Sequence, residues 1–295
     1  MQSQITRRRL LAGGAGSGLA LLAGCTSMTP FVGQRIATEY TLDVETAEQL
    51  SVIGEVGKIT IVGEDREDVD LDVVKQSSSL RTDLEDLDVE TQISGDTMEI
   101  RAEFDQDLGW LESPPSVDLD IRIPRSLSVS RVHSIVGSAE LRDVRGDLEI
   151  ESSTGSLTID GVDGSVDAQS TTGAIHIRDV SGSVAARSTT GRISVRSVGE
   201  TGDLSTNTGR IETDVPAIDG DTRISTTTGR IEAAVNPEID ADIRASTTTG
   251  RIETGALALE DGSFGDNAVS GKLGDGGPTL EFETTTGRIE LDVLE

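Results

Sequence analysis

Few residues of this sequence have the types and spacings that catalysis or metal binding requires. The two histidines, His133 and His176, lack a second histidine or cysteine at a zinc-ligand spacing, and we expect His176 to be a surface residue. No Gly-x-Ser-x-Gly motif marks a nucleophilic serine. Carboxylates are abundant, but no pair stands out as the two acids of a glycosidase or lyase. The residues therefore predict no enzyme and no cofactor, with a polysaccharide-degrading enzyme as the least favoured alternative.

Two stretches rich in aspartate and glycine are candidates for calcium ligands. They are Asp160–Gly164 and Gly274–Gly277. Neither has the nonapeptide regularity of calcium-binding β-rolls, so we interpret both as turn sequences and leave calcium as the alternative.

The only cysteine, Cys25, lies directly after a stretch that has the features of an export signal. Arg7 and Arg8 form a twin-arginine pair, a short apolar stretch follows over 10–23, and Leu-Ala-Gly-Cys25 resembles a lipobox. This order of features predicts a Tat-type lipoprotein signal peptide over 1–24, acylation of Cys25, and a flexible tether over 25–38. The alternative is an accidental cysteine at the end of a signal or anchor helix. We expect a protein exported to the cell surface and anchored to the outer face of the cell membrane.

The sequence is strongly acidic, with 53 Asp and Glu against 25 Lys and Arg and a net charge of -28. Such a surface repels phosphate, so the composition argues against nucleic acid as a partner. Acidic surfaces poor in lysine are typical of halophilic proteins, in which charge maintains solubility. A surface that binds cations is the alternative.

A short phrase of Thr or Ser, Gly, Arg or a small residue, and Ile or Leu recurs along the chain at intervals of about 18–21 residues. A period of this length with strand-like alternation is typical of stacked repeats. We therefore predict an all-β, single-stranded β-solenoid (β-helix) over 39–295, with one coil of about 18–21 residues per repeat. Each glycine is predicted to occupy a turn with positive φ. These turn glycines are Gly155, Gly173, Gly191, Gly209, Gly229, Gly250 and Gly287, with weaker copies of the phrase at Gly57, Gly137 and Gly271.

Alignment on the glycine assigns a separate role to each position of the phrase. The aliphatic residue two positions later should point inward and stack into a core column. The members of this column are Leu157, Ile175, Ile193, Ile211, Ile231, Ile252, Leu273 and Ile289. The Arg after the glycine and the Glu two positions further on should form two adjacent outward columns that neutralise each other, with a binding stripe for an anionic polymer as the alternative. The Thr columns should form hydrogen bonds along the stack, with a template for ice or carbohydrate as the alternative.

Three segments depart from the repeat. Leucines at helical spacing behind a serine run predict a short helix near 78–87. The two prolines and Trp110 in 105–116 predict a loop that leaves the main body. Because the sequence given stops directly after the strand at 289–293, we expect an unprotected strand edge there.

These motifs resemble the bacterial and archaeal family called "putative adhesin", a family of unknown function. The resemblance rests on Val56-Gly57-Lys-Ile-Thr-Ile61, on Val117-Asp-Leu-Asp-Ile-Arg-Ile-Pro124, on the Thr-Thr-Gly-Arg-Ile units and on Gly271-Lys-Leu-Gly-Asp-Gly-Gly-Pro278. It covers about residues 40–295 and implies a surface-tethered repeat protein with an adhesive or envelope-interaction role and no defined catalytic residues.

The sequence therefore leaves two non-enzymatic functions as hypotheses. The first is a lipid-anchored surface protein whose partners are the membrane, through its anchor, and an envelope glycoprotein, polysaccharide or membrane protein. The second is an envelope-stress sensor or scaffold lipoprotein that binds a protein partner at the open end.

Overall fold

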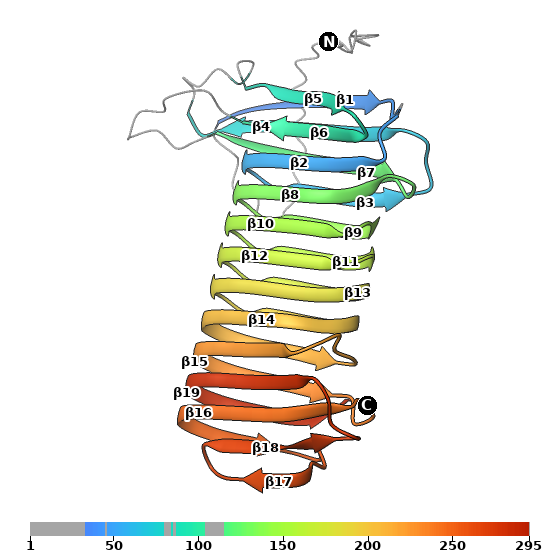
Figure 1. The fold of residues 1–295 in the computed structure, drawn as a ribbon. Coiled ribbons are helices and arrows are strands. Elements are labelled where there is room, and N and C mark those ends of the chain that lie inside the picture. The colour runs from blue at the N-terminus through green and yellow to red at the C-terminus, as the bar shows by residue number, and fades with distance from the viewer. Residues whose placement is uncertain (1–32, 45, 80–83, 85–86, 104–114, 295) are drawn as a thin grey trace, which may run out of the picture.

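The computed structural model of the protein describes residues 33–44, 46–79, 84, 87–103 and 115–294. All nineteen strands in these ranges belong to one hydrogen-bonded sheet and are stacked in layers along the length of the molecule (Figure 1). The first seven strands are β1 (Gln34–Leu42), β2 (Gln49–Val56), β3 (Ile59–Glu64), β4 (Val69–Ser77), β5 (Val89–Ser94), β6 (Thr97–Ala102) and β7 (Ser116–Pro124). The next seven are β8 (Ser128–Val136), β9 (Ala139–Arg145), β10 (Leu148–Thr154), β11 (Leu157–Asp163), β12 (Val166–Thr172), β13 (Ile175–Thr190) and β14 (Ile193–Val215). The last five are β15 (Thr222–Val235), β16 (Ala241–Thr254), β17 (Glu260–Phe264), β18 (Ala268–Leu273) and β19 (Thr279–Val293).

The all-β class is correct, but the single-stranded β-solenoid is wrong, because the parallel strands close into a ring. Strand β10 pairs with β8 and β12, and β11 pairs with β9 and β13. The long strand β13 also pairs with β12, and Ser128 of β8 pairs with Arg145 of β9. Six parallel strands, in the order β8, β10, β12, β13, β11 and β9, therefore form a closed barrel to which the other strands are added.

The repeats around β10 and β11 have a second bend, which the sequence interpretation identified as a turn only at Asp160–Gly164. Gly146 and Gly164 follow the phrase glycines by nine residues and have φ of 108° and 149°. A Cβ atom on Gly164 would lie 2.3 Å from the carbonyl oxygen of Gly146, so this corner also needs glycine. Two bends divide one repeat into two strands of seven residues each, as in β10 and β11.

Antiparallel strands cover both ends of the parallel region. At the N-terminal end, β4 pairs antiparallel with β1 and β7, and β5 pairs antiparallel with β6. At the other end, β18 pairs antiparallel with both β16 and β17. The described ranges contain no helix. Most of the helix predicted near 78–87 lies outside them, although Leu84 and Leu87 are described and buried.

The C-terminal strand β19 lies inside the stack, so the predicted unprotected edge at 289–293 is wrong. It pairs in parallel with β15 on one side, where Gly229 meets Gly287, and with β16 on the other, where Gly250 meets Gly287. Strand β19 therefore separates two repeats that are consecutive in sequence. Gly271 belongs to antiparallel β18 opposite Ile243, so the weak copy of the phrase predicted there is not a member of the parallel stack.

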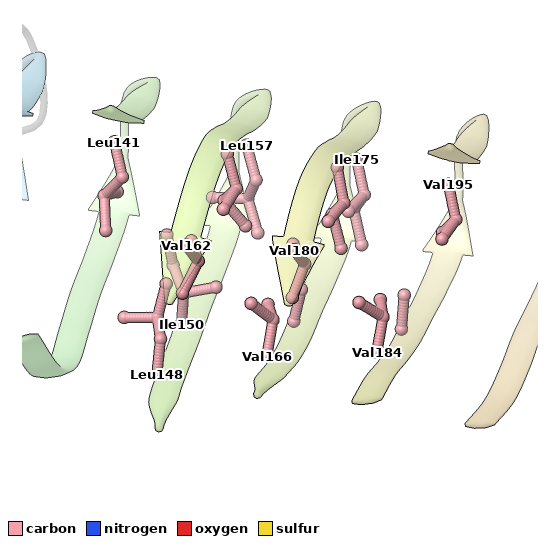
Figure 2. Close-up of a cluster of buried hydrophobic side chains, with 14 of the residues drawn as sticks. Leu141, Leu148, Ile150, Leu157, Val162, Val166, Ile175, Val180, Val184 and Val195 are labelled. Carbon is pink, nitrogen blue, oxygen red and sulfur yellow. The ribbon is translucent and has the colours of Figure 1, made fainter. Parts of the chain in front are cut away.

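The core is built from inward aliphatic columns, as the sequence predicts. Leu157, Ile175, Ile193, Ile211, Ile231 and Ile289 are fully buried. Figure 2 shows Leu157 and Ile175 in neighbouring repeats with Val162, Val180, Val166 and Val184 beside them. Because strands of a sheet lie about 4.8 Å apart, equivalent side chains of adjacent repeats come into van der Waals contact. Two members of the predicted column differ: Ile252 is only partly buried, and Leu273 is buried from the antiparallel strand β18.

Candidate binding face

The phrase glycines form one continuous ladder along a corner of the molecule. In spatial order it runs through Gly57, Gly137, Gly155, Gly173, Gly191, Gly209, Gly229, Gly287 and Gly250. Gly229 shows why the position needs glycine: its φ is 156°, and a Cβ atom would lie 1.6 Å from the carbonyl oxygen of Gly209. The ladder thus depends on a backbone-to-backbone approach that any side chain would prevent.

The Arg column beside this ladder is neutralised by the Glu column, as the sequence predicts. Arg210, Arg230, Arg288 and Arg251 meet in register across β14, β15, β19 and β16. The Nη1 atoms of the first three lie 3.2, 3.0 and 3.0 Å from the Oε1 atoms of Glu212, Glu232 and Glu290, respectively. Arg251 is more exposed, and its Nη1 lies 3.9 Å from Oε1 of Glu253. The hydrogen bond to Glu290 raises the pKa of the Arg288 guanidinium above its usual value.

The exposed Thr column does not form the hydrogen bonds that the sequence predicts along the stack. Thr208, Thr228, Thr286 and Thr249 meet in register and are all exposed. Within the described ranges, their hydroxyls make no hydrogen bond to the neighbouring repeats. These hydroxyls are therefore available to solvent or to a ligand.

A solvent-open groove of about 650 Å³ runs across the same four layers. It is lined only by Thr208–Arg210, Thr228–Arg230, Thr249–Arg251 and Thr286–Arg288, and we call it the Thr–Gly–Arg groove. It is shallow and open to solvent, unlike the enclosed clefts that hold most small-molecule ligands. A second groove of about 610 Å³ at the β8–β9 closure is lined by both signs of charge, including Glu48, Arg145 and Asp147. The Thr–Gly–Arg groove is distinguished by a lining in which arginine is the only charged residue.

A second hydroxyl column lies inside the corner, three residues before each glycine, and the sequence interpretation missed it. Its members are Ser134, Ser152, Ser170, Ser188, Thr206, Thr226, Thr284 and Thr247, all buried. The hydroxyls of Ser152, Ser170, Ser188, Thr226, Thr247 and Thr284 have no hydrogen-bond partner within the described ranges. The signal was available, because these positions lie two residues after inward aliphatics such as Ile150 and Ile224, and inward residues alternate along a strand.

Other predicted residues are not brought into this face. Cys25, Arg7, Arg8 and Trp110 lie outside the described residues. His176 is exposed, as expected, and His133 Nδ1 lies 3.3 Å from Oε2 of Glu151 on the neighbouring strand.

The two candidate calcium stretches use their aspartates and turn atoms within the protein. Asp160 forms an ion pair with Arg178, and the hydroxyl of Ser181 donates to Asp163 over 3.0 Å. The backbone N–H of Asp275 donates to Asp240 over 2.9 Å. Among the described residues, no three His, Cys, Asp or Glu side chains are grouped to hold a metal ion. The same residues contain no helix long and apolar enough to cross a bilayer.

Comparison with known proteins yields a fold likeness and no family assignment. The sequence matches no protein-family description and no curated protein. A solved structure from Parabacteroides distasonis, described as a "Putative lipid binding protein", is 13% identical and aligns with a TM-score of 0.52 over 87% of this chain and 96% of its own. This likeness concerns the fold alone.

Two further solved structures are described as putative adhesins. The one from Parabacteroides distasonis is 10% identical, with a TM-score of 0.46 over 86% of this chain and 97% of its own. The one from Bacteroides fragilis is 12% identical, with a TM-score of 0.38 over 88% of this chain and 97% of its own. These two likenesses place the chain in no family.

Proposed function

We propose that this protein is a non-enzymatic, lipid-anchored surface protein with an adhesive or envelope-interaction role, of the adhesin-like kind that its motifs resemble. The observation that carries the proposal is the Thr–Gly–Arg groove, an open face repeated in register over four layers. Repeat proteins commonly use such continuous faces for binding. Export through the Arg7–Arg8 signal and acylation at Cys25 would place this face outside the membrane.

The sensor or scaffold alternative receives less support from the fold. It depends on a strand edge at the end of the sequence, and β19 is instead paired on both sides. Within the described ranges, strand β17 pairs only with β18, so its other edge is open. All five of its residues are exposed, and it begins with two acidic residues, Glu260 and Asp261, followed by Gly262. Such a short, charged edge is a typical device against strand addition.

The proposal is tested with a strain that lacks the gene, scored for cell aggregation and attachment to a surface. We expect reduced attachment, restored by the wild-type gene. Restoration by the Cys25→Ser gene should fail, because the protein would leave the membrane. Unchanged attachment in the deletion strain would contradict the proposed role.

A further inference from the structure

The arginines of the Thr–Gly–Arg groove hold donors that the protein itself does not use. Arg210, Arg230 and Arg288 each donate to a glutamate through Nη1. Within the described ranges their Nε and Nη2 groups donate no hydrogen bond, and Arg251 donates none at all. The glutamates hold three guanidinium groups in place, and the Nε–Nη2 edge of each of these guanidinium groups remains free. A free Nε–Nη2 edge matches the two oxygens of a carboxylate or sulfate.

The lining adds a second type of donor at the same spacing. An exposed Thr hydroxyl lies two residues before each arginine, and both columns repeat with the strand spacing of about 4.8 Å. The four layers therefore present a strip about 14 Å long. Along it the Thr hydroxyls form one column and the guanidinium groups another, with the glycine backbone between them. The paired glutamates offset the repulsion between these cations, so a linear anion would be bound by the free donor edges rather than by a net positive charge.

The two inner strands of the groove offer no edge for strand addition. Strands β15 and β19 are hydrogen-bonded on both sides at the groove, so they offer no free N–H or C=O row to an extended peptide. The groove lining also contains no aromatic side chain on which a nucleic-acid base could stack. Over β15 and β19 a ligand is therefore recognised by hydroxyl and guanidinium groups.

We propose that the Thr–Gly–Arg groove binds a linear acidic polysaccharide, with its carboxylate or sulfate groups on the free edges of the arginines and its hydroxyls on the threonines. This inference rests on the proposed surface role and names the chemical class of the ligand. The glycine ladder supports the same site, because the close approach of neighbouring glycine backbones keeps the flanking Thr and Arg columns in register.

The test measures binding of the full chain in detergent to immobilised polygalacturonate and dextran sulfate, with neutral dextran and polyglutamate as comparison polymers. The variant Arg230→Gln/Arg288→Gln removes two groove charges. The matched control, Arg131→Gln/Arg178→Gln, removes two exposed arginines that form ion pairs with Glu149 and Asp160 outside the groove.

We expect either acidic polysaccharide to bind and the groove variant to lose at least about tenfold in affinity, since two guanidinium groups that form charge-assisted hydrogen bonds are removed. The control should bind as the wild type does. No binding to either acidic polysaccharide, equal loss in both variants, or equal binding of dextran or polyglutamate would overturn the inference. A negative result here leaves the attachment assay unaffected, because that assay does not depend on the polymer chosen.

Discussion

At the scale of the residue, each position of the recurring phrase has one physical task. The glycine permits the approach of neighbouring backbones, the Ile two residues later fills the core, and the Ser or Thr three residues earlier buries a hydroxyl. The sequence was sufficient to assign the Ile, Arg and Glu columns, because strand alternation determines which side chains point inward. The same alternation also places the buried hydroxyls inward, but this was overlooked because Ser and Thr are common in exposed turns.

The glycine ladder is predicted to tolerate no side chain. Gly229→Ala places a Cβ atom against the carbonyl oxygen of Gly209 in a region of φ that other residues avoid. We expect a loss of about 3 kcal/mol or more in the free energy of unfolding, against less than about 0.5 kcal/mol for Thr228→Ala on the exposed side. Denaturant unfolding of both variants measures the difference, and equal midpoints would contradict the role assigned to the glycine.

The buried hydroxyls predict the opposite response. Thr226 is buried, and its hydroxyl has no partner within the described ranges. Thr226→Val keeps the shape and removes the unsatisfied group, so we expect unchanged stability or a gain of about 1 kcal/mol. Ile224→Ala, two residues away on the same inward face, should instead cost about 2–5 kcal/mol. A clear loss on Thr226→Val in thermal unfolding would mean that the hydroxyl has a partner such as a bound water.

At the scale of the element, the strand content was predictable and the order of the stack was not. The same phrase occurs in β14, β15, β16 and β19, so the pattern carries no information about which strand lies beside which. The interval from Gly250 to Gly271 equals a repeat length by coincidence, since Gly271 lies in an antiparallel strand. The second bend was recognised as a turn only at Asp160–Gly164, because the glycines of this bend lack the Thr-rich context of the first.

The internal position of β19 predicts slow amide exchange at the C-terminal end of the sequence. Its backbone is hydrogen-bonded to two strands, and Phe282 and Ile289 are fully buried. We expect hydrogen exchange in β19 to be as slow as in β13, and exchange in the exposed strand β17 to be fast. Fast exchange throughout β19 would show that it does not lie between β15 and β16.

At the scale of the whole molecule, the strong acidity and the groove have different consequences. The net charge of -28 opposes contact with anionic surfaces over long distances, whereas the groove offers arginine donors at short range. Salt screens the long-range term first, since the Debye length is about 8 Å at physiological ionic strength. Binding to an anionic ligand in the groove should therefore persist at moderate salt.

Anchoring is also tested at this scale. Wild-type protein should fractionate with the membrane and Cys25→Ser with the soluble exported fraction, because the thiol is the predicted site of acylation. Membrane association that survives the substitution, assayed by fractionation of intact cells, would contradict the lipid anchor.

The central claim is that the Thr–Gly–Arg groove is the surface through which the protein acts, and attachment of living cells tests it most directly. A strain lacking the gene would be complemented with wild type, with Arg230→Gln/Arg288→Gln or with Arg131→Gln/Arg178→Gln, at equal surface levels of protein. We predict that attachment is restored by the wild type and by the second variant but not by the groove variant. Full restoration by the groove variant would contradict the account.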